Sequence, residues 1–268
     1  MPEKSSCRNP IKLTNSRVVG SLFCKTWCNV RRMKNSMLLR RQHIWLPTLL
    51  GWIVLLAMGA TACAIGARYI YAFLAPSDPA PHAQILVVEG WIPTEELDQA
   101  AAAFNAGKYA RIVTTGGPVD SWHNAHYGSN FAESAADYLR MHDPKLANVV
   151  PIPAPASAQD RTYLSAVMVR EWVAKSGVQV TEIDVFSSGP HARRSRLLYR
   201  LAFGPNVRVG ILAARSPDIE ELRWWDTSSG AKAVIGETIG LLWTACCFHP
   251  DPPGSREELW GPLPHKRQ

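Results

Sequence analysis

The chain has 268 residues, with 29 lysines and arginines against 22 acidic residues, which gives a formal net charge of +7. This length allows one good-sized domain with accessory segments. The positive excess lies almost wholly before residue 42, so it does not indicate that the rest binds nucleic acid. All six cysteines lie outside residues 83–245, the expected folded core. This excludes a disulfide framework, and no Cys/His spacing suits zinc.

Residues 1–43 form a basic segment that we expect to be a disordered cytoplasmic tail. Residues 1–32 show no sustained apolar period and no turn signals. The stretch that begins at Met33 is typical of the start of a membrane-anchored protein, so the preceding residues belong either to this tail or to a misplaced start. Against the single acidic residue Glu3, the basic residues are Lys4, Arg8, Lys12, Arg17, Lys25, Arg31, Arg32, Lys34, Arg40 and Arg41.

Residues 44–67 carry no charge and predict a transmembrane helix within an anchor that spans residues 44–72. Such a run is long enough to cross a hydrocarbon core of about 30 Å. Because the basic residues precede the span, the N-terminus is expected in the cytoplasm and the rest outside the plasma membrane. The aromatic residues expected at the two membrane interfaces are Trp45, Tyr69 and Tyr71.

Two alternatives to a permanent anchor remain open. A cleaved signal peptide has the same charge pattern, although the apolar run is long for one. A lipoprotein-type cleavage before Cys63 is the weaker alternative, since the leucine usual in such sites is missing. After the span, residues 73–83 form a proline-rich linker that we expect to be a semi-extended spacer.

Residues 84–248 alternate short apolar runs with helical patterns and are followed by a C-terminal tail, residues 249–268. The pattern predicts an α/β fold, a Rossmann-like three-layer αβα sandwich with a mainly parallel sheet of about five strands. The helix over residues 230–248 contains Lys232 and Glu237, so we expect it to pack on the domain and not to cross the membrane. The expected strands are 84–90, 111–117, 148–153, 182–189 and 206–214, and the other helices are 94–107, 130–142, 161–177 and 187–200.

The loops that follow the strands carry most of the candidate site residues. In open parallel sheets, ligands bind beyond the carboxyl ends of the strands. A glycine pair after one strand is usually only a turn, but four loops with polar or glycine-rich chemistry on one edge predict a ligand site. In chain order the loops supply Glu89, Gly90 and Trp91; Gly116, Gly117, Trp122, His123 and His126; Asp160, Arg161 and Thr162; and Ser187, Ser188, Gly189 and His191.

The helix that begins near Pro190 contains four arginines. A step of 100° per residue places Arg193, Arg196 and Arg200 on a solvated face, opposite a leucine face. Arg194 falls on the leucine face in the first turn, where the helix dipole favours negative charge. We therefore expect Arg194 to bind an anion or to pair with an acidic residue, and the candidate partners are Glu89, Glu133 and Asp160.

Residues 84–213 resemble the YdcF/SanA/ElyC-like family, a domain of unknown function found in small membrane-anchored envelope proteins of bacteria. That family shows a glycine pair at the end of the second strand, a Ser-Glu-Ala-like helix start, a Ser-x-Asn-Thr-x-Glu-Asn segment and a closing Thr-Ser-x-x-His-x-x-Arg motif. The matching residues are Gly116, Gly117, Glu133, Thr162, Ser188, His191 and Arg194.

The chain departs from this family pattern in two places. The sequence Glu89-Gly90-Trp91 stands where many members have further glycines, and Arg161, Leu164 and Ser165 replace other residues of the Asn-Thr-x-Glu-Asn core. These differences are typical of a divergent branch. The resemblance implies a Rossmann-like fold and a link to cell-envelope or lipid-carrier metabolism, and it implies no particular reaction.

Two functions fit these residues. In the first, the domain binds a phosphorylated or nucleotide-like small molecule through Arg194, Arg161 and the backbone amides of Gly116 and Gly117. His191 is then a candidate general acid or base, and Glu89, Glu133 or Asp160 would orient it or hold a divalent ion.

In the second, the protein is a non-enzymatic scaffold or regulator of envelope polymer assembly, and the polar cluster is a buried ionic network. A dinucleotide enzyme or methyltransferase is a third reading from the fold alone, but no G-x-G-x-x-G follows the first strand. The sequence indicates no particular cofactor. An unfilled cleft at the strand ends would favour the first function.

Overall fold

The structure is a computed structural model that describes residues 47–107, 109–119, 130–156 and 160–260. Contacts divide the chain into two units, Met1–Ala57 and Met58–Gln268. The predicted tail, residues 1–43, and the predicted site residues Trp122, His123 and His126 lie outside the described residues.

Helix α2 (Leu49–Leu74) corresponds to the predicted anchor. Within the part of the chain that the structure describes, it is the one helix long and apolar enough to cross a membrane. The helix ends at Leu74, two residues beyond the expected end of the anchor, so its last turn takes in part of the predicted linker.

The sheet has five parallel strands in the order β3-β2-β1-β4-β5, which confirms the predicted α/β class. The order reverses beside β1, where the chain passes from one side of the sheet to the other, and such a switch point is where open parallel sheets bind ligands. The strands are β1 (Ile85–Glu89), β2 (Arg111–Gly116), β3 (Val150–Pro153), β4 (Glu182–Ser188) and β5 (Arg208–Ala214).

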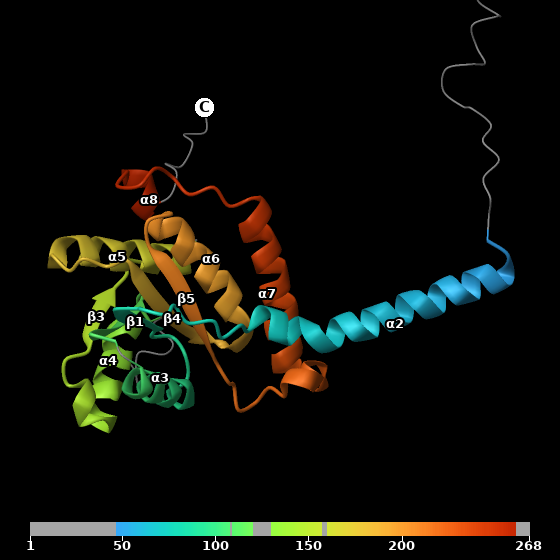
Figure 1. The fold of residues 1–268 in the computed structure, drawn as a ribbon, viewed down its shortest axis with the longest axis horizontal. Coiled ribbons are helices and arrows are strands. Elements are labelled where there is room, and N and C mark those ends of the chain that lie inside the picture. Colours follow the sequence, from blue (N-terminus) through green and yellow to red (C-terminus); the bar gives the residue numbers. More distant parts are fainter. Residues whose placement is uncertain (1–46, 108, 120–129, 157–159, 261–268) are drawn as a thin grey trace, which may run out of the picture. The chain divides into compact units, whose positions relative to one another are not determined.

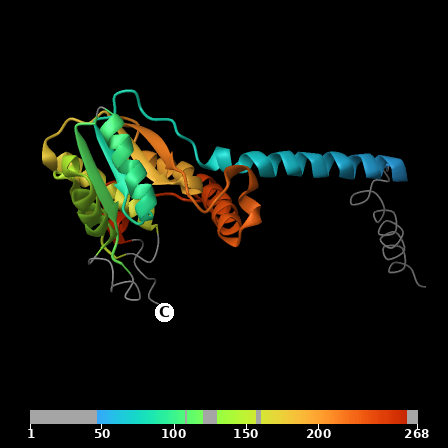
Figure 2. The same ribbon diagram turned by 90° about the horizontal axis from the view of Figure 1, so that it is seen from below.

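Helices cover both faces of the sheet, so the three-layer prediction is confirmed (Figures 1 and 2). Alternate residues of β1 show this directly. Ile85 and Val87 belong to the core beneath α5 (Arg161–Ser176) and α6 (Ala192–Phe203). Leu86 and Val88 belong to the core beneath α3 (Thr94–Ala106) and α4 (Phe131–His142). The remaining elements are η1 (Pro144–Leu146), η2 (Gly189–His191), η3 (Glu221–Asp226), α7 (Ser228–Cys246) and α8 (Arg256–Trp260).

The proline-rich linker makes contacts with the sheet that the sequence did not predict. Asp78 forms an antiparallel bridge with Ile211 of β5, with N–H to oxygen distances of 2.8 and 3.1 Å between their backbones. The Ala80 N–H donates to the buried carboxylate of Asp184 at 2.7 Å. The linker therefore covers the outer edge of β5, which would otherwise present unpaired backbone groups.

The predicted C-terminal tail also packs on the domain, at least as far as α8. Glu258 is buried and accepts two hydrogen bonds from Arg170 of α5, at 2.7 and 2.8 Å. The Gly254 N–H and the Tyr163 hydroxyl donate to the same carboxylate. The folded domain thus extends beyond residue 248, because a distant arginine supplies the partner that a buried glutamate needs.

Candidate functional site

A cleft of about 440 Å³ lies at the carboxyl edge of the sheet, beside the ends of β1 and β2. Its volume falls within the range of about 300–1,000 Å³ that is usual for small-molecule sites. The first turns of α4, α5 and α6 and one side of α7 complete the walls. The lining residues are Glu89, Trp91, Thr115, Gly116, Gly117, Pro118, Phe131, Asp160, Arg161, Thr162, Ser165, His191, Arg194, Leu198, Glu237, Trp243 and Thr244.

Most of the predicted site residues meet in this cleft, although they come from four separate loops. The residues brought together are Glu89, Trp91, Gly116, Gly117, Asp160, Arg161, Thr162, His191 and Arg194.

Five of the candidate residues that the structure describes do not line the cleft: Gly90, Glu133, Ser187, Ser188 and Gly189. A Cβ on Gly90 would lie 2.4 Å from the Phe131 carbonyl oxygen, so glycine is required there for close packing against α4. Ser188 donates to Glu96 Oε1 at 3.1 Å, a contact with α3. Glu133 lies in the first turn of α4, where its N–H bonds to Asn130 Oδ1 at 2.8 Å.

His191 is buried between two carboxylates. Its Nδ1 lies 3.0 Å from Glu237 Oε1, and its Nε2 lies 3.8 Å from Glu89 Oε2. Nδ1 also lies 3.0 Å from Arg194 Nη2, so this ring nitrogen meets both a carboxylate acceptor and a guanidinium donor. Nε2 lies 3.4 Å from the Thr162 hydroxyl. The edge of the ring meets Trp91, with centroids 5.0 Å apart.

Glu89 is held by two serines. Ser187 Oγ donates to Oε2 at 2.5 Å, and Ser195 Oγ donates to Oε1 at 2.9 Å. All three residues are buried. The hydroxyls therefore fix the carboxylate at the end of β1, facing the imidazole of His191. Ser195, on the buried side of α6, was missed by the sequence analysis because its partner is 106 residues away.

Among the described residues, Arg194 forms its ion pair with Glu237 of α7 and not with Glu89, Glu133 or Asp160, although its charge acts on Asp160. Nε lies 2.7 Å from Oε2 and Nη2 lies 3.0 Å from Oε1, which is a bidentate pair. Burial alone would raise the pKa of Glu237, but the hydrogen bonds from His191 and Arg194 lower it to about 2. A Cβ on Gly240 would lie 3.1 Å from Arg194 Nε, so that glycine makes room for the guanidinium.

The solvated face predicted for α6 is wrong for two of its three arginines. Arg196 donates to the Val209 carbonyl at 3.0 Å and pairs with Asp78 at 2.7 Å. Arg193 donates to the Phe73 carbonyl and lies over the Phe73 ring. Only Arg200 is exposed as expected. The helical-wheel prediction was wrong because the linker and the end of α2 cover this face of α6. The position of neither segment can be predicted from the sequence of α6 itself.

The first turn of α5 presents polar groups to the cleft. Its N-cap, Asp160, has a left-handed backbone (φ 52°) and its side chain caps no N–H. Burial raises the pKa of Asp160, and the charge of Arg194 opposes this shift. Arg161 is exposed, and among the described residues it has no ion-pair partner. Within the same part of the chain, the buried Thr115 hydroxyl has no hydrogen-bond partner.

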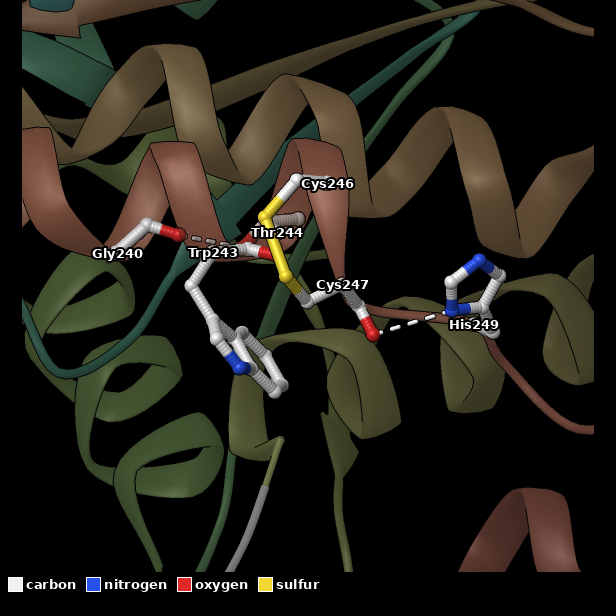
Figure 3. The surroundings of a disulfide bond; sticks show 6 residues. All are labelled: Gly240, Trp243, Thr244, Cys246, Cys247 and His249. Atoms are coloured by element: carbon white, nitrogen blue, oxygen red, sulfur yellow. Dashed lines mark hydrogen bonds between the residues drawn. A yellow bond between two sulfur atoms is a disulfide. The ribbon is translucent and has the colours of Figure 1, made fainter. Parts of the chain in front are cut away.

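Helix α7 supplies Glu237, Trp243 and Thr244, which the sequence analysis did not select. Glu237 is the single acidic residue of this largely apolar helix, and this was the available signal. The helix ends at adjacent cysteines, Cys246 and Cys247, which form a disulfide (Figure 3). This bond links neighbouring residues, and Cys63 is a free, exposed cysteine.

The structure is thus a Rossmann-like α/β domain with a cleft at its switch point, lined by histidine, acidic and arginine side chains. The described residues contain no group of histidine, cysteine and acidic side chains arranged to hold a metal ion. Comparisons with protein-family models, curated proteins and solved structures found no match for this chain.

Proposed function

We propose that this chain is a membrane-anchored bacterial envelope protein whose extracytoplasmic domain binds a phosphorylated or nucleotide-like small molecule. The observation that carries the proposal is the unfilled cleft of about 440 Å³, in which residues from four strand-end loops converge. The residues shared with the YdcF-like pattern support a role in cell-envelope or lipid-carrier metabolism. The Cys246–Cys247 disulfide supports an oxidising compartment, since such bonds are rare in the cytoplasm.

Arg161 is the cation that we assign to the anionic group of the ligand. The charge of Arg194 is balanced by Glu237, whereas Arg161 has no ion-pair partner among the described residues. It lies in the first turn of α5, where unbonded N–H groups and the helix dipole favour negative charge. The Thr162 hydroxyl lines the same wall of the cleft. To Arg194 we assign a different role, which is to position His191.

His191 is the group that we assign to proton transfer, should the ligand be processed. Nε2 faces the cleft-lining Thr162, while Glu237 holds Nδ1 and fixes the ring orientation. An imidazole that a carboxylate orients through one nitrogen is an arrangement that general acid–base catalysis uses. Glu89 lies on the far side of the ring, where it would stabilise a positive charge that develops on the imidazole.

A second candidate is a non-enzymatic scaffold or regulator of envelope polymer assembly. The hydrogen bonds among the polar residues of the cleft favour this candidate. Both oxygens of Glu89 accept hydrogen bonds from serines, and Arg194 and Glu237 form a bidentate ion pair. A network of this kind orders the fold without any ligand. The two candidates differ in what Arg161 does, because the network does not include it.

The experiment is a thermal unfolding series on the full chain in lipid nanodiscs. The probes are inorganic phosphate, pyrophosphate, a nucleoside diphosphate and an isoprenyl phosphate. We expect at least one probe to raise the unfolding temperature of the wild type, and Arg161→Ala to abolish the increase without lowering the temperature itself. Arg200→Ala, an exposed arginine on α6, is the matched control. If no probe stabilises the wild type, the scaffold is the better proposal.

A further inference from the structure

Helix α7 carries a row of large apolar side chains that the domain leaves exposed. Ile235, Ile239, Leu242 and Trp243 are 52%, 63%, 64% and 48% exposed, and we call this set the outer face of α7. Their spacing of four, three and one residues places them along one side of a helix. Glu237 and Thr244 lie on the side that lines the cleft. A continuous apolar surface of this kind marks an interaction site.

The same helix packs against the membrane-anchor helix within the unit Met58–Gln268. Val234 of α7 shares a buried cluster with Tyr71 and Leu74 of α2 and with Trp224 of η3. The Trp224 indole N–H donates to the Ala67 carbonyl at 2.7 Å. Arg68, the next residue, is the first charge after the apolar run, so Trp224 lies at the level where α2 would leave a bilayer.

Figures 1 and 2 show that α7 runs across the last turns of α2 and not along them. A helix that crosses a membrane-spanning helix at its exit lies along the membrane surface. In η3, beside the buried Trp224, Leu222 and Trp225 are 45% and 44% exposed. The domain thus presents two exposed tryptophans and several aliphatic side chains beside the end of its anchor. Tryptophan is the residue type enriched at membrane interfaces.

We propose that the outer face of α7, together with Leu222 and Trp225, lies in the interfacial layer of the lipid bilayer that α2 spans. The occupant is lipid and not a second copy of the chain, because the face is continuous with the anchor through the cluster around Tyr71 and Val234. Lys232 is exposed one turn before Ile235, where a cation on an interfacial helix meets lipid headgroups.

Trp243 belongs both to this outer face and to the wall of the cleft. The cleft therefore opens beside the membrane surface. The inference rests on the membrane anchor of the proposed function but not on the identity of the ligand. The membrane-surface inference and the proposed ligand binding can therefore fail separately.

The test is site-specific photo-crosslinking of the full chain in native membranes. The photoreactive residue p-benzoylphenylalanine replaces Ile239 or Leu242 and, as a control, Met141. Met141 is 74% exposed at the end of α4, so it matches the test positions in exposure and apolarity. All three positions are on the surface, so the replacements leave the core intact. Mass spectrometry then measures the lipid adduct at each position.

We expect lipid adducts at Ile239 and Leu242 in at least tenfold greater yield than at Met141. A crosslinked dimer, a crosslink to another protein, or a lipid yield at the test positions equal to that at Met141 would overturn the inference. Alkaline carbonate extraction in the same experiment reports on the anchor. If the chain resists extraction but gives no lipid excess, this inference fails and the proposed anchor stands.

Discussion

Arg194 and Glu237 join α6 to α7 through two hydrogen bonds, and His191 lies within 3.0 Å of both side chains. His191 ends η2 and Arg194 lies in the first turn of α6, whereas Glu237 of α7 is 43 residues beyond Arg194. The pair therefore closes one wall of the cleft and sets the orientation of the imidazole. A substitution of Arg194 should therefore lower the free energy of unfolding and also change the orientation of His191 in the cleft.

The first prediction compares two arginines of α6, Arg194 and Arg200. Arg194→Ala strands the largely buried carboxylate of Glu237, and breaking such a pair costs about 3 kcal/mol. Arg200→Ala removes an exposed side chain and should change stability by about 0.5 kcal/mol or less. Thermal unfolding of the full chain in nanodiscs measures both. Equal effects of the two alanine variants would contradict the role that the structure gives to Arg194.

The second prediction concerns stability in acid. Glu237 has a folded-state pKa of about 2, below its ordinary value of 4.5, so its ionised form favours folding. The contribution of the ionised carboxylate to the free energy of unfolding is complete when the pH is above the unfolded-state pKa. It is lost as the pH falls from about 4.5 toward 2. This shift corresponds to roughly 3 kcal/mol. Unfolding measured at pH 5, 4, 3 and 2 should show this loss in the wild type but not in Glu237→Gln.

Glu220→Gln, on an exposed residue, is the control for the acid series and should follow the wild-type curve. A Glu237→Gln variant that loses stability as steeply as the wild type over this range would show that the Glu237 carboxylate is not ionised in the folded state.

The third prediction concerns Glu96, which is fully buried on α3 and whose Oε2 has no hydrogen-bond partner among the described residues. Burial raises the pKa of Glu96, although the hydrogen bonds from Ser188 and Ser216 oppose the shift. The protonated form is therefore favoured in the folded state, and stability falls as the pH rises from the unfolded-state value toward the folded one.

Glu96→Gln mimics that protonated form and should stabilise the chain at neutral pH while leaving stability near pH 4 almost unchanged. The exposed neighbour provides the control, since Glu95→Gln should have little effect at either pH. Unfolding at pH 4 and pH 7.5 measures both variants. Destabilisation by Glu96→Gln at pH 7.5 would mean that the ionised carboxylate has a partner after all.

The strands and their loops could be predicted because their signals are local. The apolar run of β1 and the glycines after β2 are visible within a few residues, and parallel topology then brings Glu89 and Gly116 to one edge. The partners of Arg194 and Arg170 could not be predicted in this way. Each partner is a glutamate on a later helix. The apolar surroundings of Glu237 mark it as unusual, but nothing in the sequence pairs it with Arg194, or pairs Glu258 with Arg170.

The same limit explains the error on α6. The helical-wheel prediction took the side of α6 with most leucines as the buried side. In the structure the buried side is centred on Ser195 and Tyr199, and Leu201 is 36% exposed. Ser195 is buried because Glu89 accepts its hydrogen bond, and Arg193 is covered because α2 ends beside it. Helix periodicity alone carries no information about either contact.

The fourth prediction concerns topology. Ten basic residues precede the apolar run, whereas Arg68 is the only basic residue between that run and the start of β1, so the N-terminus should remain in the cytoplasm. Alkaline phosphatase, which is active only outside the cytoplasm, should therefore be active when fused after Gln268 and inactive when fused after Arg41. A cytoplasmic fluorescent reporter should give the reverse pattern at the two positions. An inactive phosphatase after Gln268, with a fluorescent reporter there instead, would place the cleft in the cytoplasm and remove the basis for an envelope ligand.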